Sequence, residues 1–309
     1  MCMGELWIES RTMTVTTPSF ATFWAGRTIS AFEAACITSF LAHGYDYTVF
    51  SYDTMDNLPD GVRLRDAREI TEEPNVRRFL IKGRPSLSHF SDLFRYELFK
   101  RTDHIWVDTD MLLLRPFDLP SYDEIIAKED AAMVCGAIMR LDRHHPNLNA
   151  LIARTEALRD QDLVWGATGP RLLTAVLDRQ TIMQKACDPK LFFPVHYNES
   201  WKAFLPEHRD ECMELCRSAF TTHLWNDRVM KIGVWKRFCP PAGSFLETRF
   251  RADGSLRFFD DVYPEPVMQS MVENWRIRCE GGATGLGQWM RQAVPSAQLT
   301  FRRRFNLAT

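Results

Sequence analysis

Short apolar segments alternate with amphipathic segments through the first half of the chain. Residues 20–24 and 47–52 are rich in aromatic and β-branched side chains, which is typical of strands. Between them, Ser30 and Glu33 have the spacing of a capping box, and we expect a helix from there to about residue 43. The alternation of strands and helices predicts an α/β domain with a mostly parallel sheet.

A second helix is predicted over residues 88–101, because Phe90, Phe94 and Leu98 recur at a spacing that forms one apolar stripe. An apolar strand over residues 104–107 follows and leads directly into an Asp-Thr-Asp sequence. The pattern in the second half is weaker. There we expect a buried strand over residues 131–139, helices over 147–158, 171–177 and 208–217, and short strands over 191–195 and 221–224.

Composition excludes several classes of protein. The 309 residues are 45% hydrophobic and 25% charged, as in ordinary globular proteins. The formal net charge of −2 argues against a protein that mainly grips nucleic-acid backbone. The longest apolar run, residues 131–139, is far shorter than the ~20 residues that a membrane-spanning helix needs. Eight cysteines without a CxxC pair indicate reduced thiols, with Cys212 and Cys216 buried on one helix face, and predict a cytoplasmic protein.

The sharpest candidate for chemistry is the pair Asp108 and Asp110, which follows an apolar strand. Two carboxylates with this spacing suit a hard cation such as Mn²⁺ or Mg²⁺, completed by phosphate oxygens and water. A second Asp-x-Asp sequence, at Asp160 and Asp162, has polar flanks and is interpreted as solvated surface. The two differ in context, because open α/β sheets bind ligands at the carboxyl ends of their strands.

Asp92 and Arg95 lie on a face of the second predicted helix that differs from its apolar stripe. Two interpretations are open. The pair forms a polar edge of the helix beside the metal, or it is a surface ion pair that contributes about 0.3–0.5 kcal/mol.

The series Ser91-Asp92-x-x-Arg95-Tyr96, an apolar strand and Asp108-Thr109-Asp110 resembles the DXD-containing sugar transferases of glycosyltransferase family 32, which include α-1,4-galactosyltransferases and initiating mannosyltransferases. The resemblance centres on residues 20–120 and weakens to about residue 230. It implies a single GT-A domain, with a Rossmann-like, mostly parallel sheet flanked by helices. Residues 1–19 would then be an extension, 20–120 the half that binds the nucleotide sugar, and 121–309 the half that binds the acceptor and closes the site.

The same resemblance implies a nucleotide-sugar donor, with a UDP-sugar favoured, a Mn²⁺ or Mg²⁺ ion, and retention of the anomeric configuration. Asp110 would ligate the cation, and Asp108 would help to hold it and contact the donor. Asp92 and Arg95 would contact the donor sugar or its phosphate. Trp24 is similar to an aromatic residue that stacks on uracil, although an aromatic residue at a strand end is also typical of a core. One departure is Thr102-Asp103, where relatives often carry two glycines.

Two later segments also resemble the family. Thr168-Gly169-Pro170 is similar to a turn whose helix begins near the donor sugar, and an ordinary capped turn explains it equally well. The segment that contains His223, Trp225 and Asn226 is similar to one that closes over the diphosphate. His223 would be a metal ligand or a phosphate donor, and the alternative is a buried core histidine.

We therefore expect a metal-dependent retaining glycosyltransferase. It would move a hexose or N-acetylhexosamine to a glycan, a lipid-linked saccharide or another hydroxyl acceptor, by a front-face route because no further carboxylate stands out as a nucleophile. Arg302, Arg303 and Arg304 are candidates for peripheral contact with the inner membrane face. The alternatives are a catalytically weak sugar-binding protein on the same fold and a metal-dependent phosphohydrolase, which would favour Gly-Thr where Met111-Leu112 follows the second Asp.

Overall fold

A six-stranded sheet forms the centre of the protein in the computed structural model, which describes residues 17–282, 285–287, 290, 293 and 297. β1, β2, β3 and β6 run parallel, whereas β9 pairs antiparallel with both β6 and the edge strand β8. The expected GT-A-type α/β fold with a mostly parallel sheet is confirmed. In sheet order, the strands are β3 (Arg63–Asp66), β2 (Asp46–Ser51), β1 (Ser19–Phe23), β6 (Ile105–Val107), β9 (Val134–Arg140) and β8 (Ile125–Lys128).

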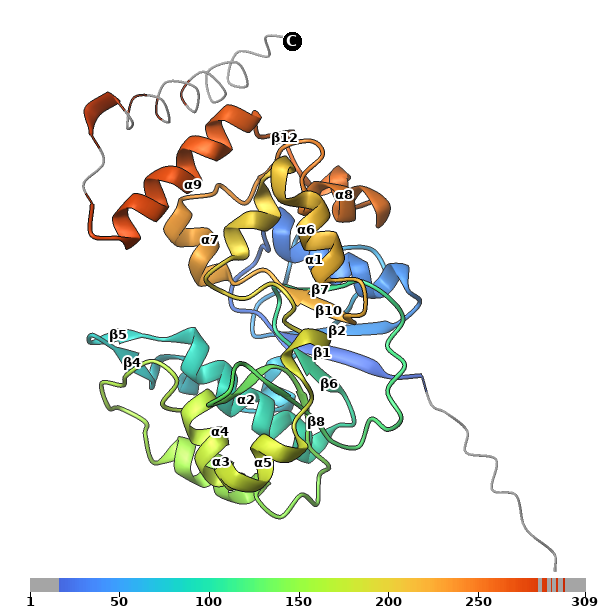
Figure 1. Ribbon diagram of the computed structural model, residues 1–309. Coiled ribbons are helices and arrows are strands. Elements are labelled where there is room, and N and C mark those ends of the chain that lie inside the picture. The colour runs from blue at the N-terminus through green and yellow to red at the C-terminus, as the bar shows by residue number, and fades with distance from the viewer. Residues whose placement is uncertain (1–16, 283–284, 288–289, 291–292, 294–296, 298–309) are drawn as a thin grey trace, which may run out of the picture.

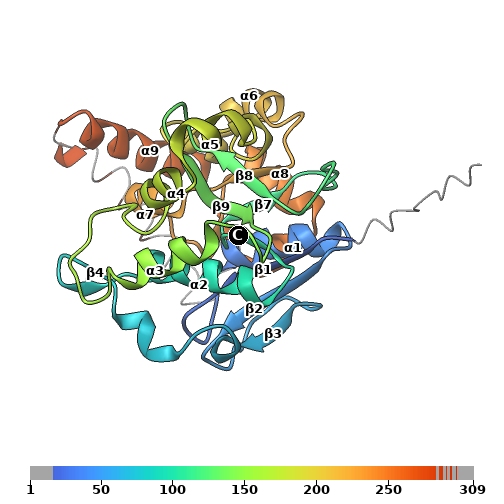
Figure 2. The same ribbon diagram turned by 90° about the horizontal axis from the view of Figure 1, so that it is seen from below.

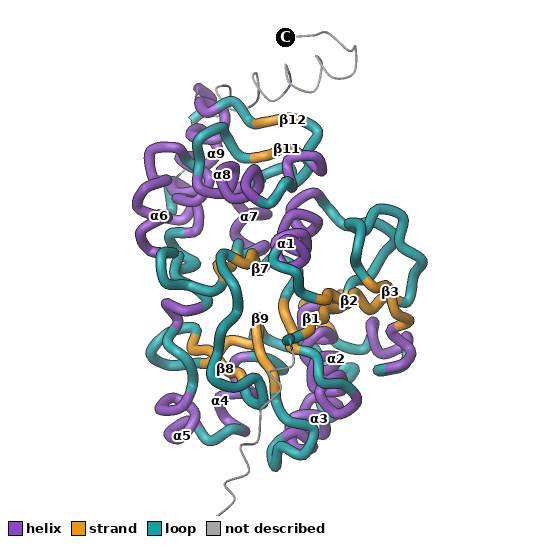
Figure 3. Tube along the Cα trace, turned by 90° about the vertical axis from the view of Figure 1, so that its right-hand side faces the viewer, coloured by secondary structure: helices purple, strands orange, loops and turns teal. Residues whose placement is uncertain are grey.

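Helices gather into two groups on either side of this sheet, as Figures 1 and 2 show. The group at the bottom of Figure 1 consists of α2 (Leu87–Arg101), α3 (Leu148–Glu156), α4 (Pro170–Val176) and α5 (Arg179–Lys185). The group at the top consists of α1 (Ala31–Ala42), α6 (Arg209–Leu215), α7 (Asn226–Ile232), α8 (Phe245–Ala252) and α9 (Glu265–Cys279). Small two-stranded pairs complete the fold: β4 (Leu80–Ile81) with β5 (Arg84–Pro85), and β11 (Phe238–Cys239) with β12 (Asp261–Val262), the latter visible at the top of Figure 3.

Helix α2 is buried on more than the one stripe that its sequence predicts. Phe90, Phe94 and Leu98 are buried as expected, and so are Leu93 and Phe99, because α2 packs against β1 and also against α3. Its polar residues are therefore enclosed by the fold as well. This is why the side of α2 that carries Asp92 and Arg95 faces protein and the cleft described below, and not bulk water.

A separate antiparallel pair, β7 (Met111–Leu113) with β10 (Thr221–His223), joins two distant parts of the chain. β7 begins one residue after Asp110, and its register pairs Met111 with His223. The Leu224 N–H donates to the carbonyl of Asp110 at 2.9 Å, which continues the pairing past the strand ends. This pair places the late segment of the sequence beside the Asp-x-Asp sequence.

Most predicted elements are confirmed within a few residues, including the capping box at Ser30 and Glu33. The predicted strand over residues 191–195 is wrong. Leu191 ends a short 3-10 helix (Pro189–Leu191), and Pro194 has no N–H with which to continue a ladder. The segment still runs beside β10, since the Phe220 N–H donates to the carbonyl of Leu191 at 2.8 Å.

Several side expectations concern the surface. Asp160 and Asp162 are exposed, and Cys212 and Cys216 are buried free thiols, as predicted. Within the described part of the chain, no helix has the length and apolarity needed to cross a bilayer. The candidate membrane contact at residues 302–304 lies outside the described residues.

Candidate functional site

A cleft of about 770 Å³ opens at the carboxyl ends of β1 and β6. β1 lies between β2 and β6 in the sheet. The strands that follow β1 in the sequence, β2 and β3, lie on one side of it, and the next strand of the sheet, β6, lies on the other side. Open α/β sheets bind ligands at such a switch point. Most of the predicted site residues line this cleft, namely Trp24, Asp92, Arg95, Asp108, Asp110, His223, Trp225 and Asn226.

Three potential metal ligands converge in the cleft. Asp108 follows β6, Asp110 precedes β7, and His223 ends β10. Each offers one ligand atom, and these atoms lie within 4.8 Å of one another. The residues predicted to hold a metal are thus brought together, although His223 lies far from the two aspartates in the sequence.

Asp110 is buried and strongly favours its charged form. Burial would raise the pKa of this carboxyl, but His223 Nε2 at 3.2 Å and the Asn226 N–H at 2.8 Å from its Oδ2 atom lower the pKa to about 2. Burial opposes the charged form of His223, yet the neighbouring Asp110 raises the pKa of the imidazole. Among the residues that the structure describes, the buried Nδ1 atom of His223 has no hydrogen-bond partner.

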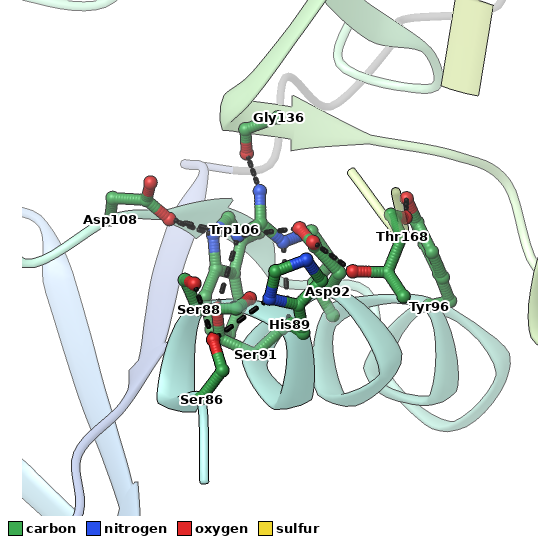
Figure 4. Close-up of polar contacts among 11 residues, drawn as sticks. Ser86, Ser88, His89, Ser91, Asp92, Tyr96, Trp106, Asp108, Gly136 and Thr168 are labelled. Carbon is green, nitrogen blue, oxygen red and sulfur yellow. Dashed lines mark hydrogen bonds and ion pairs between the residues drawn. The ribbon is translucent and has the colours of Figure 1, made fainter. Parts of the chain in front are cut away.

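Arg95 connects Asp92 to Asp108 inside the protein. Its Nη2 atom lies 3.3 Å from an oxygen of Asp92 and 3.2 Å from an oxygen of Asp108, and its Nη1 atom donates to the carbonyl of Gly136 (Figure 4). The Arg95 and Asp92 side chains are only 5% and 11% exposed, so the surface ion-pair interpretation is wrong. The guanidinium also lies over the Trp106 ring, 4.8 Å from its centroid.

Asp92 is held from a second direction by the turn before α4. The Thr168 hydroxyl donates to Asp92 Oδ2 at 2.7 Å, and the Tyr96 hydroxyl fixes this turn by donating to the carbonyl of Thr168 at 2.9 Å. A Cβ atom on Gly169 would lie 2.8 Å from the same carboxylate oxygen, so only glycine fits there without a shift. Burial raises the pKa of Asp92 against the opposing effect of Arg95. Thr168 and Gly169 thus stand behind Asp92 and not on the cleft wall.

The aromatic residues of the site are positioned by their indole N–H groups. Trp24 is half-buried at the end of β1 and donates to the carbonyl of Thr28 at 3.0 Å. Trp225 has a left-handed backbone, with φ 57°, and donates to the carbonyl of Val195 at 3.0 Å. Its ring centroid lies 4.0 Å from that of His223, so Trp225 packs closely against the imidazole.

Sequence reasoning missed two residues that hold the network together. The Trp106 indole donates to Asp108 Oδ1 at 2.7 Å. The two-residue period of a strand, which puts Trp106 and Asp108 on one side, could have indicated this contact. A Cβ atom on Gly136 would clash with Arg95 Nη1, and an isolated glycine within an apolar strand is a signal of such a close approach.

Sequence reasoning also missed two carboxylates. Glu129 and Asp130, in the turn between β8 and β9, line the cleft, and burial together with Asp130 raises the pKa of Glu129. Two further carboxylates therefore lie at the cleft, contrary to the expectation from the sequence. Nothing in the sequence alone indicated that this turn faces the site, because β8 itself was not predicted.

Part of this chain is similar to known glycosyltransferases. Residues 141–237 match the alpha 1,4-glycosyltransferase conserved region. The chain is 23% identical over 207 residues to lactosylceramide 4-alpha-galactosyltransferase of Rattus norvegicus, covering 58% of this chain and 56% of that protein. It is 24% identical over 172 residues to the protein of the same name from Homo sapiens, covering 48% of each.

The chain thus spans about half the length of the curated relatives that it matches. The conserved region contains Thr168, Gly169, His223, Trp225 and Asn226, and so lies later in the chain than the resemblance over residues 20–120 on which the prediction was centred. The predicted family resemblance is confirmed, and the matched region is the part of the chain in which only a weaker resemblance was expected.

Proposed function

We propose that the chain is a metal-dependent, retaining glycosyltransferase of the DXD-containing family 32 type, because its conserved region and its curated relatives are similar to sugar transferases of that kind. It transfers a hexose or N-acetylhexosamine from a UDP-sugar to a hydroxyl group of a glycan or lipid-linked saccharide. The observation that carries this proposal is the convergence of Asp108, Asp110 and His223 in one cleft. The names of the relatives, which specify a galactosyl transfer to lactosylceramide, favour galactose as the first donor sugar to test.

The residues present fit a divalent transition metal. Carboxylates are ligands for hard cations, and imidazole binds first-row transition metals, so the mixed set suits Mn²⁺. The buried His223 imidazole, with one nitrogen near Asp110 and the other without a partner among the described residues, has ring nitrogen available for a ligand. A bound Mn²⁺ would act as a Lewis acid that stabilises the charge on the departing nucleotide diphosphate.

The protein's own charges explain why a cation is needed. A carboxylate that faces a diphosphate oxygen at about 4 Å without a metal would cost about 4 kcal/mol at an effective dielectric constant near 20. Arg95 does not relieve this repulsion, because its donors are directed to Asp92, Asp108 and Gly136. We assign Arg95 to positioning: it holds the Asp108 carboxylate toward the metal and the Asp92 carboxylate toward the donor sugar.

The test is UDP release from UDP-galactose and other UDP-sugars by the full chain in MnCl₂, with and without saccharide acceptors. Asp110→Asn is the variant of choice, since Asp110→Ala would also remove the acceptor of the Asn226 N–H at the start of α7. We expect UDP release to fall by at least about 100-fold, because loss of a ligand should exceed the 10- to 100-fold effects typical when only a partner of a ligand is removed. The matched control is Asp162→Asn in the exposed Asp-x-Asp sequence.

EDTA should abolish the wild-type activity and added Mn²⁺ should restore it. Full activity in chelator, or equal activity of the Asp110→Asn and Asp162→Asn variants, would refute the metal site. The anomeric configuration of the product, read by proton NMR, tests retention separately.

A further inference from the structure

Among the tryptophans that the structure describes, Trp165 stands out because it is 56% exposed and lines the cleft. We infer that its indole face forms an acceptor subsite, on which the apolar face of a pyranose ring of the acceptor saccharide stacks. This inference rests on the proposed function and adds to it the surface by which the second substrate is recognised.

An exposed indole in a cleft needs an explanation. Large apolar side chains are normally buried, as Trp106 and Trp275 are in this protein. Leu87, the first residue of α2, is also largely exposed and lines the same cleft. Ligand sites commonly combine such apolar and aromatic surface with a few polar groups that fix orientation.

The loop that carries Trp165 is fixed on both sides of the indole. Before it, the ring of His89 makes a hydrogen bond at 3.0 Å to the carbonyl of Val164. After it, the Tyr96 hydroxyl donates to the carbonyl of Thr168 at 2.9 Å. Both contacts come from α2, so the indole is displayed from an anchored segment. A preorganised aromatic surface binds its ligand without first paying an ordering cost in entropy.

The contacts of this loop tie Trp165 to the sugar end of the donor site. Thr168 donates to Asp92, the residue assigned to the donor sugar, and lies three positions after Trp165. Trp24, the residue assigned to the nucleobase, follows β1 and belongs to a different wall element. An acceptor hydroxyl must reach the anomeric carbon of the donor sugar, so an acceptor ring is expected beside Asp92 and not beside the base.

The chemistry of the lining favours a neutral saccharide ring. A pyranose has an apolar face of C–H groups and a rim of hydroxyls. Trp165 and Leu87 offer apolar surface to the cleft. Ser88 and Ser91, which lie one turn apart near the start of α2, line the same cleft and carry hydroxyl groups. Aromatic rings combine a large apolar area with a defined geometry, which suits recognition of one face of a ring.

The experiment compares the full chain with Trp165→Ala, Trp165→Phe and Val164→Ala. Val164 is the matched control, because it is 61% exposed in the same loop and is absent from the cleft lining. The probes are lactose and methyl pyranosides of galactose, glucose and mannose. Saturation-transfer NMR in the presence of UDP and Mg²⁺, which is diamagnetic, reports which ring protons contact the protein. UDP release from UDP-galactose in Mn²⁺ reports both KM values. Circular dichroism verifies that each variant is folded.

We expect Trp165→Ala to lose saturation transfer to the pyranose ring protons and to raise the acceptor KM by about tenfold or more, as for loss of about 1.4 kcal/mol or more. Trp165→Phe should keep most of both signals, because it retains an aromatic face. Val164→Ala should match the wild type. Acceptor-free hydrolysis and the KM for UDP-galactose should stay within about twofold in all three variants, a change of under 0.5 kcal/mol.

Three results would overturn the inference. The first is unchanged acceptor binding by Trp165→Ala, and the second is a raised KM for UDP-galactose in that variant, which would assign the indole to the nucleobase. The third is absence of saturation transfer to every pyranoside in the wild type. Failure of the proposed function looks different. In that case the wild type releases UDP from no UDP-sugar, while its saturation transfer to a pyranoside still depends on Trp165.

Discussion

Trp106→Phe removes one hydrogen bond from the metal carboxylate and leaves a ring in its place. The Trp106 side chain is buried, and its N–H donates to Asp108 Oδ1 at 2.7 Å. Phe keeps an aromatic surface beneath the Arg95 guanidinium, which lies 4.8 Å from the indole centroid. The variant therefore asks whether the sheet itself orients Asp108 for the cation.

The size of the effect follows from the partners. A hydrogen bond to a charged group contributes about 1.5–3 kcal/mol. The Asp108 side chain is 30% exposed, so water can replace part of the lost bond, and we take the lower end of this range. About 1.5 kcal/mol corresponds to a roughly tenfold weaker Mn²⁺ affinity. This agrees with the 10- to 100-fold losses typical when a partner of a metal ligand is removed.

The assay measures Mn²⁺ binding by titration calorimetry and, in parallel, the dependence of UDP release on the Mn²⁺ concentration. Trp275→Phe is the matched control, because it makes the same chemical change in the buried core of α9, away from the cleft lining. We expect the Mn²⁺ concentration for half-maximal activity to rise about tenfold in Trp106→Phe only. Equal Mn²⁺ affinity in the two variants would refute the view that Trp106 positions Asp108.

Further predictions concern the same network. Gly136→Ala should displace the Arg95 guanidinium, because the new Cβ would clash with its Nη1 atom, and should cost about 1–3 kcal/mol of unfolding free energy, measured in urea. Gly169→Ala should push Asp92 away and raise the KM for the donor about tenfold, with kcat read separately. Mn²⁺ at about 100 times its Kd should stabilise the wild type by about 2.7 kcal/mol in a thermal shift, and a similar shift in Asp110→Asn would contradict the assigned ligand.

The first half of the fold could be predicted because each element carries a local signal. The capping box at Ser30 begins α1, and the apolar strand before Asp108 is β6. β3 was missed, since its four residues Arg63–Asp66 are all exposed and mostly charged. This strand pairs with β2 through its backbone and through the ion pair of Arg63 with Asp46 at 2.9 Å. It lies at the sheet edge, where charged side chains discourage further pairing. A hydrophobic pattern does not find it.

The second half shows a signal that was present and overlooked. Ser244 and Glu247 have the same S-x-x-E spacing as Ser30 and Glu33, and in the structure the Ser244 side chain accepts from the Glu247 N–H at 3.2 Å to begin α8. Other parts of the site had no local signal. The contact of His223 with Asp110 depends on the pairing of β10 with β7, which joins residues more than a hundred positions apart.

The chain contains two Asp-x-Asp sequences, and only one of them lies in a candidate binding site. Asp160 and Asp162 have the spacing of Asp108 and Asp110, yet Asp160 pairs with Arg78 at the surface and Asp162 accepts from the Gly83 N–H at 3.2 Å. Both carboxylates are exposed, and their protein partners are Arg78 and a backbone N–H, neither of which lines the cleft. Asp108 is held by Trp106 and Arg95, and Asp110 by the Asn226 N–H. Both carboxylates lie beside the His223 imidazole in a cleft. The arrangement that distinguishes them is the supporting network, so substitutions in that network should impair metal binding even where both aspartates remain.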